Sequence, residues 1–285
     1  MGGYTGKILH IPETVNGYTV TAIAPQAFYA QSHIEEVHLP NSVRTVGELA
    51  FYHCAKLRRV EMPGVTEIGS NAFARCESLS DIELPSTLTS LGDSAFLNCS
   101  SLEAISIPTT ITSIAPRTFY RCTGLSSVKL HDGITAIGEY AFCECGAVRI
   151  SSLPAQLKSI GSFAFSQCYG LKTLQIPQGV TTLSTHAFSK CSSLTSVTVP
   201  EGVSVIDMNV FTQCSKIQQI QLHATLKKIG KTAFNNCHAL ADIYYSGTKA
   251  TWNTIQKDTD WNASLGSSVG HYTVHCTDGD IAFTY

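Results

Sequence analysis

A phenylalanine recurs through this 285-residue chain at an almost constant interval. Every step is 23 residues long except the one from Phe51 to Phe73, which is 22. The column comprises Phe28, Phe51, Phe73, Phe96, Phe119, Phe142, Phe165, Phe188, Phe211 and Phe234. A period of about 20–29 residues is typical of solenoids, whose stacked units contact only their neighbours. We therefore expect one continuous repeat array, in which a surface rather than an enclosed pocket carries the function.

A cysteine follows this phenylalanine by three residues in nine of the ten units, and Gln31 takes its place in the first. The column comprises Cys54, Cys76, Cys99, Cys122, Cys145, Cys168, Cys191, Cys214 and Cys237. Equivalent side chains of stacked strands lie about 4.8 Å apart and point the same way, whereas a disulfide needs Cβ atoms turned toward each other. We therefore predict a buried ladder of free thiols, which act as small apolar side chains and weak donors. Cys143 and Cys276 lie outside the column.

The charge of the chain is low and nearly balanced. Charged residues make up 14 % and the net charge is −2, against a typical charged fraction of about 25 %. This balance gives no reason to expect nucleic acid or acidic lipid as a partner. No apolar run approaches the roughly 18 residues of a membrane span, so we expect no membrane insertion. Residues 1–4 lack the features of a signal peptide, as would a chain whose leader had been trimmed.

Two apolar patterns interlock within each unit. The first, as in Leu57, Val60 and Met62, alternates over its last four residues and therefore predicts a strand. The second, as in Val43 and Val46, precedes the Ala-Phe pair. We interpret it as the opposite wall of each coil, in short extended or turn structure.

Proline and glycine mark the corners between these patterns. Proline, which lacks a backbone donor, usually ends the first strand, at Pro40, Pro63, Pro85, Pro108, Pro154, Pro177 and Pro200. A glycine lies four residues before the phenylalanine at Gly47, Gly69, Gly92, Gly138, Gly161 and Gly230. Recurring glycine at one corner indicates either a positive φ angle or a close backbone approach.

Both ends of the array depart from the period, as capping requires. Asn16-Gly17 lies between two strand-like runs and predicts a two-residue hairpin, so we expect residues 1–22 to form an N-terminal β-hairpin cap. The solenoid then occupies residues 23–245. Residues 246–285 carry Trp252, Trp261 and Tyr272 without periodicity, and we expect them to form an aromatic C-terminal cap.

These units resemble the BspA-like class of leucine-rich repeats, whose units have the form L-x-x-I-x-L-P-x-x-V-x-x-I-x-x-x-A-F-x-x-C. The resemblance covers about residues 11–245. It implies a mainly β repeat solenoid, a right-handed array with one parallel β-sheet face. Family members are mainly surface or secreted proteins of host-associated bacteria and are linked to adhesion. The resemblance therefore implies an extracellular or cell-surface location, and it carries over no catalytic residues.

The sixth unit departs from the family pattern. Ser151 stands where the middle apolar residue of the strand belongs, and Ile150 lies beside it. We expect a shifted or bulged strand in this unit.

The outward positions of the predicted sheet flank the buried middle residue of each strand. The candidate binding face comprises Glu36, His38, Arg59, Glu61, Asp81, Glu83, Lys129, Thr173, Gln175, Ser196, Thr198, Gln219, Gln221 and Tyr244. Its N-terminal third is charged, and the remainder is rich in hydroxyl and amide groups. Two interpretations stay open. One is a binding face for a protein segment or a glycan, and the other is a solvated surface on which Arg59 pairs with Glu36 and Asp81 for less than about 1 kcal/mol.

Catalytic and metal chemistry find little support in the sequence. No Gly-x-Ser-x-Gly elbow or Cys/His pair stands out. His271, His275 and Cys276 have suggestive spacing for zinc but lack a second close ligand pair. The segment 258–262 begins like a calcium loop, but Ala263 and Val269 replace its glycine and glutamate. We expect no cofactor and no enzyme activity.

Our leading hypothesis is a non-catalytic module, displayed on a bacterial surface or secreted, that binds a protein ligand through its sheet face. The alternative is a glycan-binding module that uses the neutral part of the face and the aromatic residues of the cap. A third possibility is a spacer that holds another domain away from the cell.

Overall fold

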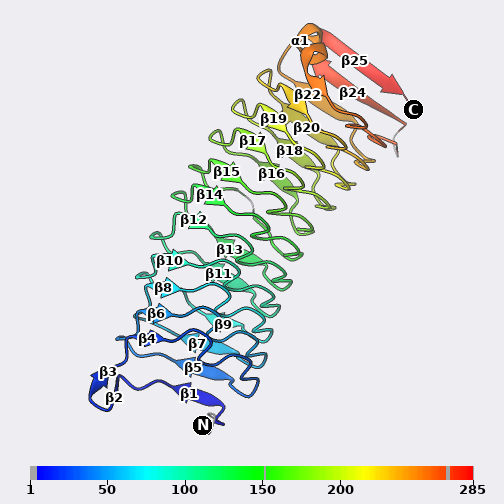
Figure 1. Cartoon of the computed structure of the whole chain (residues 1–285). Coiled ribbons are helices and arrows are strands. Elements are labelled where there is room, and N and C mark those ends of the chain that lie inside the picture. The colour runs from blue at the N-terminus through cyan, green and yellow to red at the C-terminus, as the bar shows by residue number, and fades with distance from the viewer. Residues whose placement is uncertain (1–4, 151, 268–269, 285) are drawn as a thin grey trace.

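The computed structural model describes residues 5–150, 152–267 and 270–284. The chain forms an elongated stack of coils, as the family resemblance predicts (Figure 1). Strands on two walls of the stack pair in parallel with the equivalent strands of neighbouring coils. The fold is therefore a mainly β solenoid.

The first wall is the sheet face. In chain order its strands are β1 (Ile8–His10), β5 (Glu36–His38), β7 (Arg59–Glu61), β9 (Asp81–Ile82), β11 (Ala104–Ser106), β13 (Ser127–Lys129), β16 (Thr173–Gln175), β18 (Ser196–Thr198), β20 (Gln219–Leu222) and β22 (Asp242–Tyr245). The middle residue of nearly every strand is buried, and its neighbours face outward. This is the alternation that the first apolar pattern predicts.

The second wall consists of two-residue strands, and in all of them but the last the second residue is the final apolar residue of the second pattern. They are β4 (Ala22–Ile23), β6 (Thr45–Val46), β8 (Glu67–Ile68), β10 (Ser90–Leu91), β12 (Ser113–Ile114), β14 (Ala136–Ile137), β15 (Ser159–Ile160), β17 (Thr182–Leu183), β19 (Val205–Ile206), β21 (Lys228–Ile229) and β23 (Gln256–Lys257). The expected opposite wall is thus a second parallel ladder.

The corner that carries the phenylalanines forms a third ladder, without strands. Each column phenylalanine donates its backbone N–H to a carbonyl in the next coil or cap at 2.8–3.1 Å. Consecutive rings stack with centroids 5.2–5.8 Å apart through all ten residues. The last ring, Phe234, meets the edge of Trp261 at 6.2 Å.

The thiol column completes this corner. All eleven cysteines are free, and the nine of the column are buried. Each column thiol donates to the carbonyl of the phenylalanine in the preceding coil, with Sγ–O distances of 2.9–3.2 Å. Burial raises the pKa of Cys54, Cys122 and Cys237 to about 12. These three thiols therefore stay protonated, and the hydrogen bonds of the whole column join each coil to the one before it.

The glycine column is explained by close approach, not by a positive φ angle. A Cβ built on any of its six glycines would lie 2.5–2.7 Å from backbone of the preceding coil. Positive φ angles of 54–62° occur instead two residues before and two residues after each column phenylalanine. The residues with these φ angles include Leu49, Tyr140 and Phe163, whose side chains are large.

The second wall is interrupted at two of the coils where glycine is missing from this column. Ala115 and Ser184 take the glycine position in two coils, and there β10 does not pair with β12, nor β15 with β17, in the described chain. On the face, β9 and β11 separate at the first of these places. Asp207 also replaces the glycine while β17 and β19 stay paired. A Cβ at the glycine position therefore favours loss of strand pairing between neighbouring coils, but it is not sufficient for that loss.

The sixth coil interrupts the face again. Residues 148–150 lie in no strand, and Ser151, where we expected a shifted or bulged strand, lies outside the described residues. The phenylalanine corner continues past this coil, with Phe142 bonded to Ala164 at 2.8 Å and Phe165 to Ala187 at 2.8 Å. The contacts at the phenylalanine corner are therefore continuous along the whole stack, whereas the strand pairing of both sheets is interrupted.

At the N-terminal end, β2 (Thr14–Val15) and β3 (Tyr18–Thr19) form the hairpin that Asn16-Gly17 predicts. The strand β1, however, pairs in parallel with β5. The sheet therefore begins at residue 8, within the segment expected as a cap.

At the C-terminal end, α1 (Lys249–Thr254) precedes a second hairpin of β24 (His271–Cys276) and β25 (Gly279–Thr284). The strand β24 pairs in parallel with β22 and so extends the sheet face into the cap. No helix in the described residues is long and apolar enough to span a membrane.

Candidate functional site

The sheet face carries most of the predicted binding residues in exposed or half-buried positions along one side of the stack. The interruptions after β9 and at the sixth coil divide it into three stretches. The first stretch, β1 to β9, is charged. The last, β16 to β25, is mainly neutral, and Lys129 lies on the short middle stretch with β13.

Arg59 is the centre of the charged stretch. Its guanidinium donates to Glu61 of its own strand at 2.6 Å and approaches Asp81 at 3.5 Å. Arg59 lies between Glu36 and Asp81 in the strand register, as expected, and Glu36 attracts its guanidinium at longer range. The close contacts of Glu36 are instead with His38 at 3.6 Å and Arg58 at 3.7 Å. The ion pairs of Arg59 therefore join residues of the same strand as well as residues of neighbouring strands. The strand register by itself predicts only the second kind.

Glu61 is shared by two coils. It accepts a hydrogen bond from His38 at 2.6 Å as well as the one from Arg59. These two bonds, that of His38 first, lower the pKa of Glu61. His38 in turn stacks on His10 with centroids 4.6 Å apart. Glu61 thus stays ionised, and the stretch keeps its negative charge at neutral pH.

A groove of about 670 Å³ opens beside these residues. Three carboxylates, Glu61, Asp81 and Glu83, and the single guanidinium of Arg59 line it. Its apolar lining is Leu39, Val60, Met62, Pro63, Leu84 and Pro85. A second hollow of about 400 Å³ follows where β9 and β11 separate, with Lys129 among its lining residues. The arrangement is a negatively charged trough with an apolar floor.

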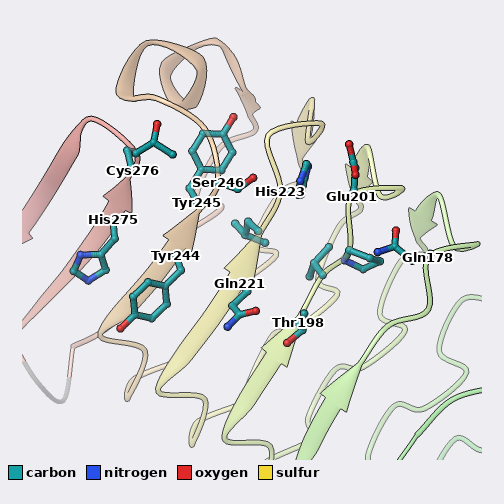
Figure 2. A pocket seen from close by; sticks show the side chains of 14 residues that line it. Gln178, Thr198, Glu201, Gln221, His223, Tyr244, Tyr245, Ser246, His275 and Cys276 are labelled. Atoms are coloured by element: carbon teal, nitrogen blue, oxygen red, sulfur yellow. The ribbon is translucent and has the colours of Figure 1, made fainter.

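The neutral stretch ends in another groove, of about 490 Å³ (Figure 2). Thr198, Gln221, Tyr244 and His275 project from neighbouring strands along its floor (Figure 2). The Tyr244 side chain is 42 % exposed, and its ring stacks on His275 with centroids 4.8 Å apart. Glu201 lies at the opposite rim.

His275 links the last coil to the terminal hairpin. Its Nε2 lies 2.9 Å from Asp242 of β22, and its Nδ1 lies 3.0 Å from Asp280 of β25. Only the doubly protonated ring donates both bonds. The hydrogen bond to Asp242, followed by that to Asp280, raises the pKa of His275.

The residues considered for metals do not gather into a site. No group of three His, Cys, Asp or Glu side chains in the described chain could hold an ion. His275 and Cys276 both line this groove, and Cys276 also packs against the core. In the calcium-like segment, Asp258 pairs with Lys228 at 3.1 Å.

The tryptophans of the cap serve packing. Trp252 is 2 % exposed and lies between Tyr245 and Trp261, with centroids at 5.3 and 6.1 Å. Lys257 approaches its ring at 4.7 Å. Trp252 therefore offers no free face to a sugar, and among the described residues of this end the exposed aromatic ring is Tyr244.

Sequence reasoning missed the part of the face that the cap contributes. Thr273 and His275 of β24 continue the rows of Asp242 and Tyr244, and Asp280 follows on β25. A signal was present: Asp-Gly at 278–279 lies between two alternating runs, the pattern of a tight hairpin. This hairpin lies beyond the last 23-residue unit, so the repeat pattern does not predict it.

The family comparison agrees with the coil pattern. The family model described as "BspA type Leucine rich repeat region (6 copies)" matches residues 21–149 and again residues 135–259. No curated protein matches the chain.

Two solved structures with TM-scores above 0.5 share the architecture. A leucine rich cell surface protein from Faecalibacterium prausnitzii is 28 % identical, with a TM-score of 0.57, and the match covers 90 % of this chain and 92 % of that one. The pneumococcal vaccine antigen PcpA is 17 % identical, with a TM-score of 0.51 and coverages of 96 % and 88 %. A leucine rich repeat protein from T. pallidum is 27 % identical, with a TM-score of 0.41 and coverages of 75 % and 79 %.

Proposed function

Because the chain belongs to the BspA-type leucine-rich repeat family, we propose that it is a non-catalytic adhesion module that binds a protein ligand on a bacterial surface or after secretion. The similar protein from Faecalibacterium prausnitzii is described as a cell surface protein, which supports this location. Fold alone does not define a ligand, so the choice of partner rests on the sheet face.

The charged trough is the observation that carries the proposal. Glu61, Asp81 and Glu83 line it with only Arg59 to balance them, so it attracts positive charge. Its apolar floor suits the aliphatic stems of lysine and arginine, which bury carbon while the charged end reaches a carboxylate. We place the contact of a basic segment of the host or microbial ligand here.

A pull-down with host extracellular proteins, followed by titration of the captured protein, tests the proposal. The double variant Asp81→Lys/Glu83→Lys should weaken binding at least tenfold, and added salt should weaken binding to the native chain. Matched bulky variants on the neutral stretch, Thr173→Tyr and Thr198→Tyr, should bind as the native chain does.

Two results would contradict this proposal. If all four substitutions leave the affinity unchanged, the ligand does not use the sheet face. If only the tyrosine variants lose binding, the face binds its partner through the neutral stretch instead of the trough.

A glycan is the second candidate ligand, favoured by the exposed Tyr244 ring in the neutral groove. Hydroxyl and amide groups of Thr198, Gln178 and Gln221 line the same groove, and an aromatic ring in a groove with hydrogen-bonding groups suits a sugar. A glycan array distinguishes the candidates. Glycan binding that Tyr244→Ala abolishes and Asp81→Lys/Glu83→Lys preserves would favour the second.

A further inference from the structure

The strand β25 is an open sheet edge. It is the outermost strand of the sheet order β16-β18-β20-β22-β24-β25 and is joined along one side to β24 (Figure 1). Alternate residues of an edge strand direct their N–H and C=O groups away from the sheet. No backbone hydrogen bond within the described residues reaches this outer side.

This edge lacks most of the features that normally protect one, although α1 contacts β25 and Lys249 lies beside Gly279. Natural sheet edges are blunted by very short strands, by lysine, by proline or by bulges. At the other end of the face β1 is three residues long, but β25 has six residues with neither lysine nor proline. Its one charged residue, Asp280, is engaged with His275 at 3.0 Å. The strand is therefore a template for a further strand.

The sequence of β25 is complementary to itself in the antiparallel sense. A two-fold axis perpendicular to the sheet keeps side chains on their own face only if one residue lies opposite its own copy. Centred on Ala282, this pairing sets Ile281 of each copy opposite Phe283 of the other, on the side that packs against the core. On the exposed side Asp280 lies opposite Thr284, and no like charges meet. Cross-strand aliphatic–aromatic pairs of this kind stabilise sheets.

We propose that β25 pairs with β25 of a second copy of this chain, about a two-fold axis at Ala282. The pairing joins the two sheet faces edge to edge, with both faces on the same side. One strand pair buries less than the roughly 1,200 Å² of a standard stable interface, so the dimer is reversible and depends on concentration. The inference does not depend on the proposed ligand of the trough.

Disulfide trapping tests the register directly. With Cys276→Ser in the background, the remaining native thiols are buried. In Ala282→Cys the two introduced thiols face each other across about 4.5–5.5 Å between Cα atoms, which a disulfide spans. In the matched control Thr284→Cys, the same strand and face place the two copies of residue 284 about 14 Å apart.

Mild oxidation should therefore give several-fold more covalent dimer with Ala282→Cys than with Thr284→Cys. Equal yields from the two variants would overturn the register. Sedimentation of the native chain should show a mass that rises toward that of a dimer with concentration. A monomer at all concentrations, or open chains of many copies, would overturn the pairing itself.

A charge variant separates pairing from folding. Ala282→Lys places two like charges opposite each other at the axis, which opposes pairing, and it leaves the exposed side of one folded hairpin otherwise intact. We expect dissociation to shift to at least tenfold higher concentration with an unchanged thermal unfolding curve of the monomer. Unchanged dimerisation in this variant would contradict the proposal. The ligand affinity of the trough variants tests the proposed function alone, because these variants leave β25 unchanged and should dimerise as the native chain does.

Discussion

The phenylalanine corner and the sheet face lie on the same coils, yet one is continuous and the other is not. Through the corner, ten rings stack without a break and each thiol bonds to the coil before it. On the face, the ladder opens between β9 and β11 and again at the sixth coil. The corner holds the stack together, whereas the face is free to vary in shape and charge.

The difference follows from what each residue contacts. A corner residue touches the same residue type above and below, so any change must suit two neighbours at van der Waals distance. A face residue such as Thr198 or Gln221 has solvent on one side. Substitutions in the two regions should therefore differ most in their effect on the free energy of unfolding.

The largest effect is expected from a charge in the corner. Cys122→Asp removes the donor to the Phe96 carbonyl and buries a carboxylate without a partner, which should lower the free energy of unfolding by about 3–5 kcal/mol. Urea unfolding measures the loss. The matched variant Cys276→Asp, at a half-buried thiol of the cap, should cost less. Equal stability of the two variants would remove the distinction between corner and surface thiols.

A methyl group on the glycine column should have the next largest effect. The Cβ of Gly92→Ala would lie 2.5 Å from the backbone nitrogen of Ser70, so the coils must separate, as they do at Ala115. We expect a loss of about 1–3 kcal/mol in unfolding free energy. In the control Gly146→Ala, the new Cβ meets only the exposed Tyr169 ring, at 3.1 Å, and should change stability little. A neutral Gly92→Ala would contradict close approach as the reason for the column.

A smaller effect is expected from pH at the end of the face. The pKa of His275 is raised above its ordinary value of 6.5, so its two hydrogen bonds stabilise the hairpin fully below that value. This contribution is lost as the pH rises through the raised pKa of the folded state. It should stay under about 1 kcal/mol, because the group is partly exposed.

Thermal unfolding of His275→Gln against the native chain, between pH 5 and pH 9 in about one-unit steps, isolates this contribution. The comparison is needed because burial lowers the pKa of His186. This group makes the fold less stable as the pH falls, which opposes the effect of His275, and it is present in both proteins. Parallel curves for the two proteins would show that His275 does not contribute.

The smallest effect is expected on the neutral face. Thr173→Lys and Thr198→Lys should each change the free energy of unfolding by less than about 0.5 kcal/mol, because their side chains meet solvent. Urea unfolding under the same conditions as for Cys122→Asp provides the scale. A loss above 1–2 kcal/mol, on the order of a core defect, would mean that the face shares the constraints of the corner.

Much of this contrast was predictable from residue spacing. The two walls, the buried middle residue of the face strands and the hairpin at Asn16-Gly17 all follow from local pattern. The positive φ angles at Leu49, Tyr140 and Phe163 do not, because no glycine or asparagine marks those positions. Hydrogen bonds from coil to coil, such as His53 to Ala74 at 2.8 Å, hold the backbone in that region, and they exist only in the stack.

The candidate site was predictable in part. The outward positions up to Tyr244 follow from the strand period, whereas His275 and Asp280 lie beyond the last repeat. The partner of Arg59 depends on side-chain reach rather than register, since Glu61 and Asp81 lie closer to it than Glu36 does. The trough and the neutral groove are shapes that arise between coils, and no single unit contains them.

The sequence by itself determined the coil, the stacking and the identity of the buried residues, because a fixed interval brings identical side chains into contact with one another. Only the tertiary structure decided where the sheets open, which charges pair and how the terminal hairpin extends the face. These features depend on how differing side chains of neighbouring coils fit together, and a repeat pattern holds no information about the residues in which its copies differ.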